Sequence, residues 1–142
     1  SREVMEKSFE YYIDKPDWNL GHVFCPSIHL AVACRLGRRR EASEFFRIWD
    51  DFFLPPHNAV REILMNTEGI VFLTGAAGYL LDLIYGFAGI RISEDGIEVK
   101  PLLPEGISRI VFKKILYRGK AYRLIVEKRN GVETYDLKEI SK

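Results

Sequence analysis

The segment Ala59–Ile92, AVREILMNTEGIVFLTGAAGYLLDLIYGFAGIRI, constrains the fold more than any other part of the chain. Its part Gly69–Ile90 carries a single charge, that of Asp82, and five glycines. A membrane-spanning helix needs roughly 20 apolar residues, but here a charge would lie near its middle. A run of buried strands is disfavoured by the length and by Ala76 and Ala77. We therefore expect a buried helix within a larger helical core.

Glycines define how such a helix would pack and where it would end. Gly75 and Gly78 would let a neighbouring backbone approach closely. Gly86 or Gly89 would end the helix in a left-handed cap. A helix buried all round needs several neighbours, and the remaining sequence supplies few. We therefore expect the chain either to form a homo-oligomer or to be the end of something larger.

Composition excludes several classes of protein. With 142 residues, 47% of them hydrophobic, the chain has enough apolar material for one domain or two small ones. A net charge of +1 gives no general attraction to nucleic acid or to an anionic membrane. Cys25 and Cys34 lie about 13 Å apart along one predicted helix, too far for a disulfide bond. We expect a reduced, cytoplasmic protein without a signal peptide, and the missing initial methionine suggests that the chain begins partway through a larger one.

Apolar residues at helical spacing predict three helices before the apolar segment. The first covers Arg2–Ile13, and the second covers Pro26–Leu36, with Ser27 as its cap and Gly37 at its end. The third covers Arg39–Phe53, where a pair of prolines stops it. The second and third helices would form a helical hairpin, the unit of bundles, solenoids and helical barrels.

After Gly89 the apolar period changes from that of a helix to that of a strand. Turn dipeptides separate the β-rich runs, and the strands are predicted at 89–93, 97–100, 107–117, 120–128 and 132–137. The end of the chain, 138–142, is expected to fray. These patterns predict an α+β protein with a helical part at 1–88 and an antiparallel β domain at 89–142.

Three segments resemble the C-terminal end of glycoside hydrolase family 65. They are CPSIHLAVACRLGRRREASEFF, REILMNTEGIVFLTGAAGYLLDLIYGFAGIRI and GIEVKPLLPEGISRIVFKKILYRGKAYRLIV. The family contains disaccharide phosphorylases, acid trehalases and protein-glucosylgalactosylhydroxylysine glucosidase. The resemblance implies the last helices of an (α/α)6 barrel followed by an antiparallel β-sandwich-like domain.

The resemblance also implies a catalytic residue. Family 65 enzymes invert the anomeric carbon, and inverting hydrolysis needs a general acid and a general base. A glutamate ten residues before the phenylalanine of FLTG matches the base of the hydrolase branch, and here it is Glu62. Composition alone favours a solvated loop carboxylate or a partner of Arg61 for Glu62, and the resemblance reverses that preference. The matching acid belongs to a motif that this sequence does not contain, so we expect the isolated chain to be inactive.

Three further residues are candidates for substrate binding. Trp18 could stack on a sugar ring, and a buried structural tryptophan is the alternative. His29 could face the barrel interior, or it could be a core histidine bonded to backbone. Glu68 is a second carboxylate near the predicted helix start, where a capping role is the alternative.

The expected partners are a carbohydrate, an α-linked glucoside by the resemblance, and the rest of the barrel, in the same polypeptide or in a partner subunit. No cofactor and no metal site are expected, because His22 and His57 lack ligands at suitable spacing. The predicted function is that of the C-terminal portion of an inverting α-glucoside hydrolase. The alternative predictions are a phosphorylase of the same family and a non-catalytic carbohydrate-binding or assembly module.

Overall fold

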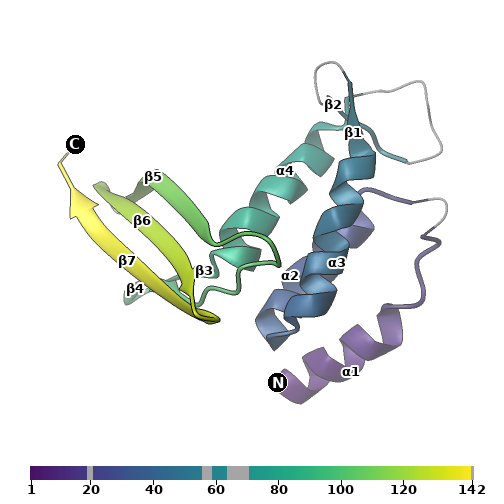
Figure 1. Ribbon diagram of the computed structural model, residues 1–142, viewed down its shortest axis with the longest axis horizontal. Helices are drawn as coiled ribbons and strands as arrows, with labels where there is room; N and C mark the ends of the chain where they lie inside the picture. Colours follow the sequence, from purple (N-terminus) through teal and green to yellow (C-terminus); the bar gives the residue numbers. More distant parts are fainter. Residues whose placement is uncertain (19–20, 56–58, 64–70, 142) are drawn as a thin grey trace.

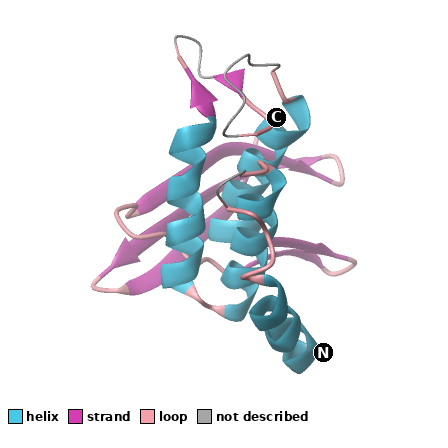
Figure 2. Cartoon of the chain, turned by 90° about the vertical axis from the view of Figure 1, so that its right-hand side faces the viewer, coloured by secondary structure: helices cyan, strands magenta, loops and turns pink. Residues whose placement is uncertain are grey.

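The computed structural model describes residues 1–18, 21–55, 59–63 and 71–141, and it has an α+β fold (Figure 1). The helices are α1 (Arg2–Tyr12), α2 (Phe24–Leu36), α3 (Arg39–Ile48) and α4 (Leu73–Leu81), with a 3₁₀ turn η1 (Trp49–Phe52) after α3 and a π-helical turn η2 (Asp82–Phe87) after α4. The strands are β1 (Phe53–Leu54), β2 (Ala59–Val60), β3 (Ile90–Ser93), β4 (Gly96–Val99), β5 (Arg109–Tyr117), β6 (Lys120–Arg129) and β7 (Val132–Ile140). The helices lie on one side and the three-stranded sheet on the other, as both views show (Figures 1 and 2).

Helices α2 and α3 form the predicted hairpin. Gly37 adopts the left-handed conformation at φ +80° and ends α2 as expected. The next helix is shorter than predicted, because the chain tightens into η1 after Ile48. A 3₁₀ turn places residues three apart on the same side, and here it buries both Trp49 and Phe52. The predicted cap Ser27 is wrong, since α2 begins at Phe24 and Ser27 lies inside it.

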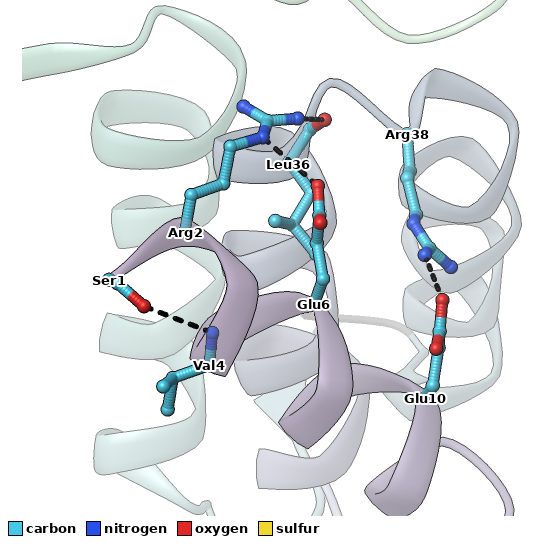
Figure 3. Close-up of polar contacts among 7 residues, drawn as sticks. All are labelled: Ser1, Arg2, Val4, Glu6, Glu10, Leu36 and Arg38. Atoms are coloured by element: carbon cyan, nitrogen blue, oxygen red, sulfur yellow. Dashed lines mark hydrogen bonds and ion pairs between the residues drawn. The ribbon is translucent and has the colours of Figure 1, made fainter.

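Helix α1 is attached to the hairpin by polar contacts at the C-terminal end of α2 (Figure 3). Ser1 caps the first turn of α1. The guanidinium of Arg2 donates to the carbonyl oxygen of Leu36 over 2.9 Å, and Arg38 donates to Glu10 over 2.7 Å. The first of these bonds satisfies a terminal helix carbonyl that has no partner within α2.

The glycines of α4 and η2 face α2, as the sequence predicts for Gly75 and Gly78. A Cβ atom at Gly75 would lie 2.9 Å from Val23, and one at Gly86 would lie 2.8 Å from Leu30. The close approach is made by side chains of α2 rather than by its backbone. The missing Cβ atoms therefore allow α4 and η2 to lie directly against α2.

The opposite face of α4 is exposed in this chain. Leu73 is 77% exposed, and Leu80 and Leu81 are about half exposed. The burial expected for the apolar segment is therefore present on one face only, and the other face has no cover among the described residues. No helix among the described residues is both long enough and apolar enough to cross a membrane.

The helical segment ends at Gly89, which adopts φ +63°. After it, β3 and β4 form one antiparallel hairpin, and β5, β6 and β7 form a three-stranded antiparallel sheet in that order. The expected fraying at the end of the chain is wrong, because β7 continues to Ile140, which pairs with Ala121 of β6. Pairing with β6 therefore keeps residues 138–140 in the strand.

The main core lies between the helices and the strands. Its fully buried side chains come from α2, η2, β6 and the segment before β5, and they include Leu30, Phe87, Leu103, Leu124 and Val126. A second, smaller cluster fills the other end of the helical layer, around Val23, Trp49, Phe52 and Val60. Backbone groups of three residues of this second cluster, Val23, Phe52 and Val60, make the hydrogen bonds that hold the candidate site.

Candidate active site around Glu62

Backbone hydrogen bonds hold Glu62 in place at one end of the helical layer. The Arg61 amide donates to the carbonyl oxygen of Phe52, the last residue of η1, over 3.1 Å. The Val23 amide, at the start of α2, donates to the carbonyl oxygen of Glu62 over 3.0 Å. Residues 61 and 62 are therefore fixed to two different helical elements.

The start of α4 is attached to the same place. The Phe72 amide donates to the carbonyl oxygen of Val60 over 2.7 Å, and Phe72 is the N-cap of α4. The short strands β1 and β2 lie beside the start of α4 in Figure 1. Glu62 thus follows a two-strand ladder at the point where α2 and α4 begin.

The carboxylate of Glu62 is exposed. It has no hydrogen bond or ion pair to any residue that the structure describes. The neighbouring guanidinium of Arg61 turns away and donates twice to the carbonyl oxygen of Asp51, once over 3.0 Å. The salt bridge to Arg61 that the sequence left open is therefore not formed, and no other described residue binds the carboxylate oxygens of Glu62.

Trp18 lies in the connection between α1 and α2, and its ring packs into the core. Its indole nitrogen donates to the carbonyl oxygen of Ile13 over 3.2 Å. Its ring stacks on Phe45 at a centroid distance of 5.6 Å and meets His29 edge-on at 5.3 Å. These contacts give Trp18 a structural role, and its binding of substrate stays a prediction.

His29 is buried on α2 beside Trp18, and both of its ring nitrogens face backbone carbonyl groups. Nδ1 lies 2.7 Å from the oxygen of Cys25, and Nε2 lies 3.2 Å from the oxygen of Tyr12. An apolar hollow of about 310 Å³ between α1 and α2 has His29 in its wall. The structure thus brings Trp18 and His29 together, and no contact joins either of them to Glu62. The substrate-binding role of His29 also stays a prediction, and Glu68 lies outside the described residues.

Asp82 was noticed in the sequence only as a lone charge, and the structure makes it the centre of a polar cluster. It is 1% exposed, at the junction of α4 and η2. One carboxylate oxygen accepts from Ser27 Oγ and the other from Trp49 Nε1, each over 3.0 Å. Burial raises the pKa of Asp82 to about 7, although its two hydrogen bonds act in the opposite direction. The sequence signal for this cluster is the aspartate within an apolar helix. Its partners could not be predicted, because they are 55 and 33 residues away in the sequence.

Metal binding has no support among the described residues, where no group of three or more His, Cys, Asp or Glu side chains could hold an ion. Cys25 and Cys34 are both free thiols. Burial raises the pKa of Cys34 to about 12, so this thiol stays protonated and is a poor nucleophile. Among the described residues, the group that could act chemically at the Glu62 end is a carboxylate rather than a metal ion or a thiol.

Residues 90–138 match the family model described as "Glycosyl hydrolase family 65, C-terminal domain". An uncharacterized glycosyl hydrolase of Mycobacterium leprae is 34% identical over 80 residues, which make up 56% of this chain and 10% of the relative. Protein-glucosylgalactosylhydroxylysine glucosidase of Dictyostelium discoideum is 27% identical over 126 residues, which make up 87% of this chain and 17% of the relative. This chain therefore spans less than a fifth of the length of either relative.

A solved structure has the same fold over the whole chain. It is described as a putative kojibiose phosphorylase from human microbiome, and it matches with a TM-score of 0.70 and 20% sequence identity. The match covers 100% of this chain and 22% of the other one. At this identity the likeness concerns the fold alone.

Proposed function

We propose that the chain is the C-terminal part of an inverting glycosidase of family 65, because residues 90–138 match the C-terminal domain model of that family. In this proposal Glu62 is the general base, and the substrate is an α-linked glucoside. The observation that carries the proposal is the exposed carboxylate of Glu62, which has no partner among the described residues and whose backbone is held on both sides. Names of relatives that contain "glycosyl hydrolase" and "glucosidase" support the hydrolytic alternative.

In an inverting mechanism the base acts on a water molecule. The carboxylate accepts a proton from the water as its oxygen attacks the anomeric carbon, on the face opposite to the leaving oxygen. In the same step a general acid protonates the leaving oxygen as its bond to the anomeric carbon breaks, and this acid lies about 6.5–9.5 Å from the base so that the water fits between them. The oxygens of Glu62, which have no partner among the residues with a described structure, suit the first role. The acid has to come from outside this chain, in the part of the family that the resemblance places upstream.

The exposed face of α4 suggests where that upstream part lies. Leu73, Ala77, Leu80 and Leu81 are exposed and recur at the spacing of one helix face. We propose that the remaining helices of an (α/α)6 barrel cover this face, in the same polypeptide or in a partner subunit. The share of each relative that the chain spans, less than a fifth, supports this choice over a homo-oligomer. In the same proposal the β part belongs to a β-sandwich and the boundary lies near residue 88.

Replacing Glu62 tests the proposal. In the full-length protein, Glu62→Gln should lower kcat for hydrolysis of an α-linked glucose disaccharide by about a thousandfold, because the amide cannot accept a proton. KM should change little. Release of β-glucose as the first product, followed by NMR, would report inversion of the α-linkage. Near-normal turnover of the glutamine variant would overturn the assignment.

A matched control uses another exposed glutamate. Glu94 lies in the turn between β3 and β4, far along the chain from α2 and η1. Glu94→Gln removes the same charge, so it should leave kcat within about twofold of the parent protein. Equal losses in both variants would point to a general effect of charge rather than to a base at Glu62.

Phosphorolysis is the second candidate, because the solved structure with the same fold is described as a putative phosphorylase. In a phosphorylase, inorganic phosphate takes the place of water and no protein base is needed. Turnover that requires phosphate and yields a glucose 1-phosphate, with Glu62→Gln retaining activity, would favour that function. Binding of the sugar without any bond cleavage would instead favour a non-catalytic module.

A further inference from the structure

We propose that Asp82 is a positioning residue for Glu62, because it ties together the elements that hold residues 61 and 62. This inference rests on the proposed role of Glu62 as the general base. Asp82 does not touch the Glu62 side chain, so its effect would pass through backbone hydrogen bonds. Two such routes leave the Asp82 carboxylate in different directions, one through α2 and one through η1.

The first route runs through α2. Ser27 Oγ donates to one oxygen of Asp82 over 3.0 Å. Val23 lies four residues earlier, one helical turn away, and its amide donates to the carbonyl oxygen of Glu62 over 3.0 Å. The Ser27 bond therefore fixes how far α2 lies from Asp82, and the end of α2 fixes the backbone of Glu62.

The second route runs through η1. Trp49 Nε1 donates to the other oxygen of Asp82 over 3.0 Å, inside the core. Trp49 is the first residue of η1, and Phe52 is the last. The carbonyl oxygen of Phe52 accepts from the Arg61 amide over 3.1 Å. A short helical turn of four residues thus connects the carboxylate to the residue before Glu62.

A third element, α4, is also hydrogen-bonded to the segment before Glu62, and Asp82 lies at its end. It follows α4, and the N-cap of α4, Phe72, donates its amide to the carbonyl oxygen of Val60 over 2.7 Å. The Asp82 side chain therefore bonds to α2 and η1, and Asp82 itself directly follows α4. Each of these three elements, or the N-cap residue before it, makes a backbone hydrogen bond to one of the residues 60–62. A carboxylate suits this place because its two oxygens can each accept from a different donor, here Ser27 and Trp49.

The choice of residue at this position points to a function beyond folding. A leucine would bury well in a segment as apolar as α4, whereas a buried carboxylate must lose its hydration. Residues that do not suit their local environment, such as a charged residue in an apolar helix, are expected mainly at functional or strained sites. The helix also widens into a π-turn that begins at Asp82, and such turns are frequent at functional sites.

The test combines kinetics with hydrogen exchange in the full-length protein. Asp82→Ala should lower kcat by about ten- to a hundredfold with KM changed less than about threefold, because a shift of about 1 Å at a catalytic group costs that much. The amides of Val23 and Arg61, followed by hydrogen–deuterium exchange and mass spectrometry, should exchange at least about tenfold faster. Ser27→Ala breaks only the first route, so it should speed exchange mainly at Val23.

Asp82→Asn is the rescue variant. Its amide oxygen can accept from Trp49 Nε1 while its N–H group donates to Ser27 Oγ, so both routes survive. We expect kcat within about threefold of the parent and unchanged exchange at both amides. Should the alanine variant fail to fold, Asp82→Asn and Ser27→Ala still decide the question. Loss of kcat in the asparagine variant with both amides still protected would overturn positioning.

Ser43→Ala is the matched control for Ser27→Ala. Ser43 is a buried hydroxyl on α3 that donates to the Arg39 carbonyl and accepts from the Glu105 amide, away from Glu62. It should lower stability without faster exchange at Val23 or Arg61. Faster exchange there in Ser43→Ala, or unchanged exchange in Asp82→Ala, would overturn the inference. If Glu62→Gln keeps its activity, the proposed function fails, while the exchange measurements still decide whether Asp82 positions residues 61 and 62.

Discussion

At the scale of single residues, Asp82 and Glu62 differ in what the sequence reveals about them. Family resemblance alone makes Glu62 a candidate base, because nothing in its spacing separates it from other loop glutamates. Asp82 is visible as a charge within an apolar helix, but its partners Ser27 and Trp49 are 55 and 33 residues away. No local pattern specifies such distances, because they depend on how α2, η1 and α4 pack.

Asp82 should make the stability of the chain depend on pH. Its pKa is about 7 in the folded state, against 3.8 for an ordinary aspartate, and burial is the main cause. Between these two values the folded state holds a proton that the unfolded state has lost, so stability falls as pH rises. Below about pH 4 both states are protonated, and above about pH 7 the loss is complete. The loss approaches about 4 kcal/mol at most.

Asp82→Asn isolates this contribution, since the amide does not titrate. We expect the variant to gain stability relative to the parent chain as pH rises from 4 to 8, with most of the change between pH 4 and 7. Urea unfolding of both proteins at several pH values measures the difference, and the other ionisable groups cancel. A difference that stays constant over this range would contradict a carboxylate with a raised pKa.

At the scale of elements, turn chemistry was the most reliable guide. Arg118 and Gly119 both have positive φ, and so do Asn130 and Gly131, as tight hairpin turns require. The strands therefore lie close to their predicted ranges. The predictions were wrong at the end of α3, where burial of Trp49 tightens the turn, and at the end of β7, where pairing with β6 prevails. Both outcomes depend on contacts between elements rather than on local pattern.

Gly89 and Gly37 offer a matched test of the glycines that end helices. Both have positive φ, but a Cβ atom at Gly89 would lie 1.7 Å from the carbonyl oxygen of Lys100, whereas one at Gly37 would meet nothing within 4 Å. The Lys100 amide also donates to the Gly89 carbonyl over 3.0 Å, which leaves little freedom to move apart. Gly37→Ala should cost about 1 kcal/mol, and Gly89→Ala about 3 kcal/mol or more.

Denaturant titrations of the two alanine variants check this difference. A shift of the unfolding midpoint that is several times larger for Gly89→Ala is the expected result. Equal shifts would mean that the left-handed backbone alone, and not the contact between Gly89 and Lys100, sets the loss of stability.

At the scale of the whole molecule, the apolar segment indicated that the chain needs more neighbours than it contains. In the structure, one face of α4 lacks neighbours and is exposed, whereas the face with the glycines is packed on α2. Local periodicity could not show which face would stay open, because the segment is apolar all round. Which face of α4 stays exposed follows from the glycines, because α2 can pack closely only against the face that lacks Cβ atoms.

The same substitution in two lengths of protein tests whether barrel helices cover the open face. In the 142-residue chain, Leu73→Glu with Leu80→Glu places charges on side chains that are largely exposed, so the unfolding midpoint should shift little and self-association in gel filtration should decrease. In the full-length protein, covered by other helices, the same charges would be buried without partners and should cost several kcal/mol. Val4→Glu, at another exposed apolar residue, on α1, is the control. Equal and small effects in both lengths would mean that the face remains in water, and the proposed barrel would then lack its contact with α4.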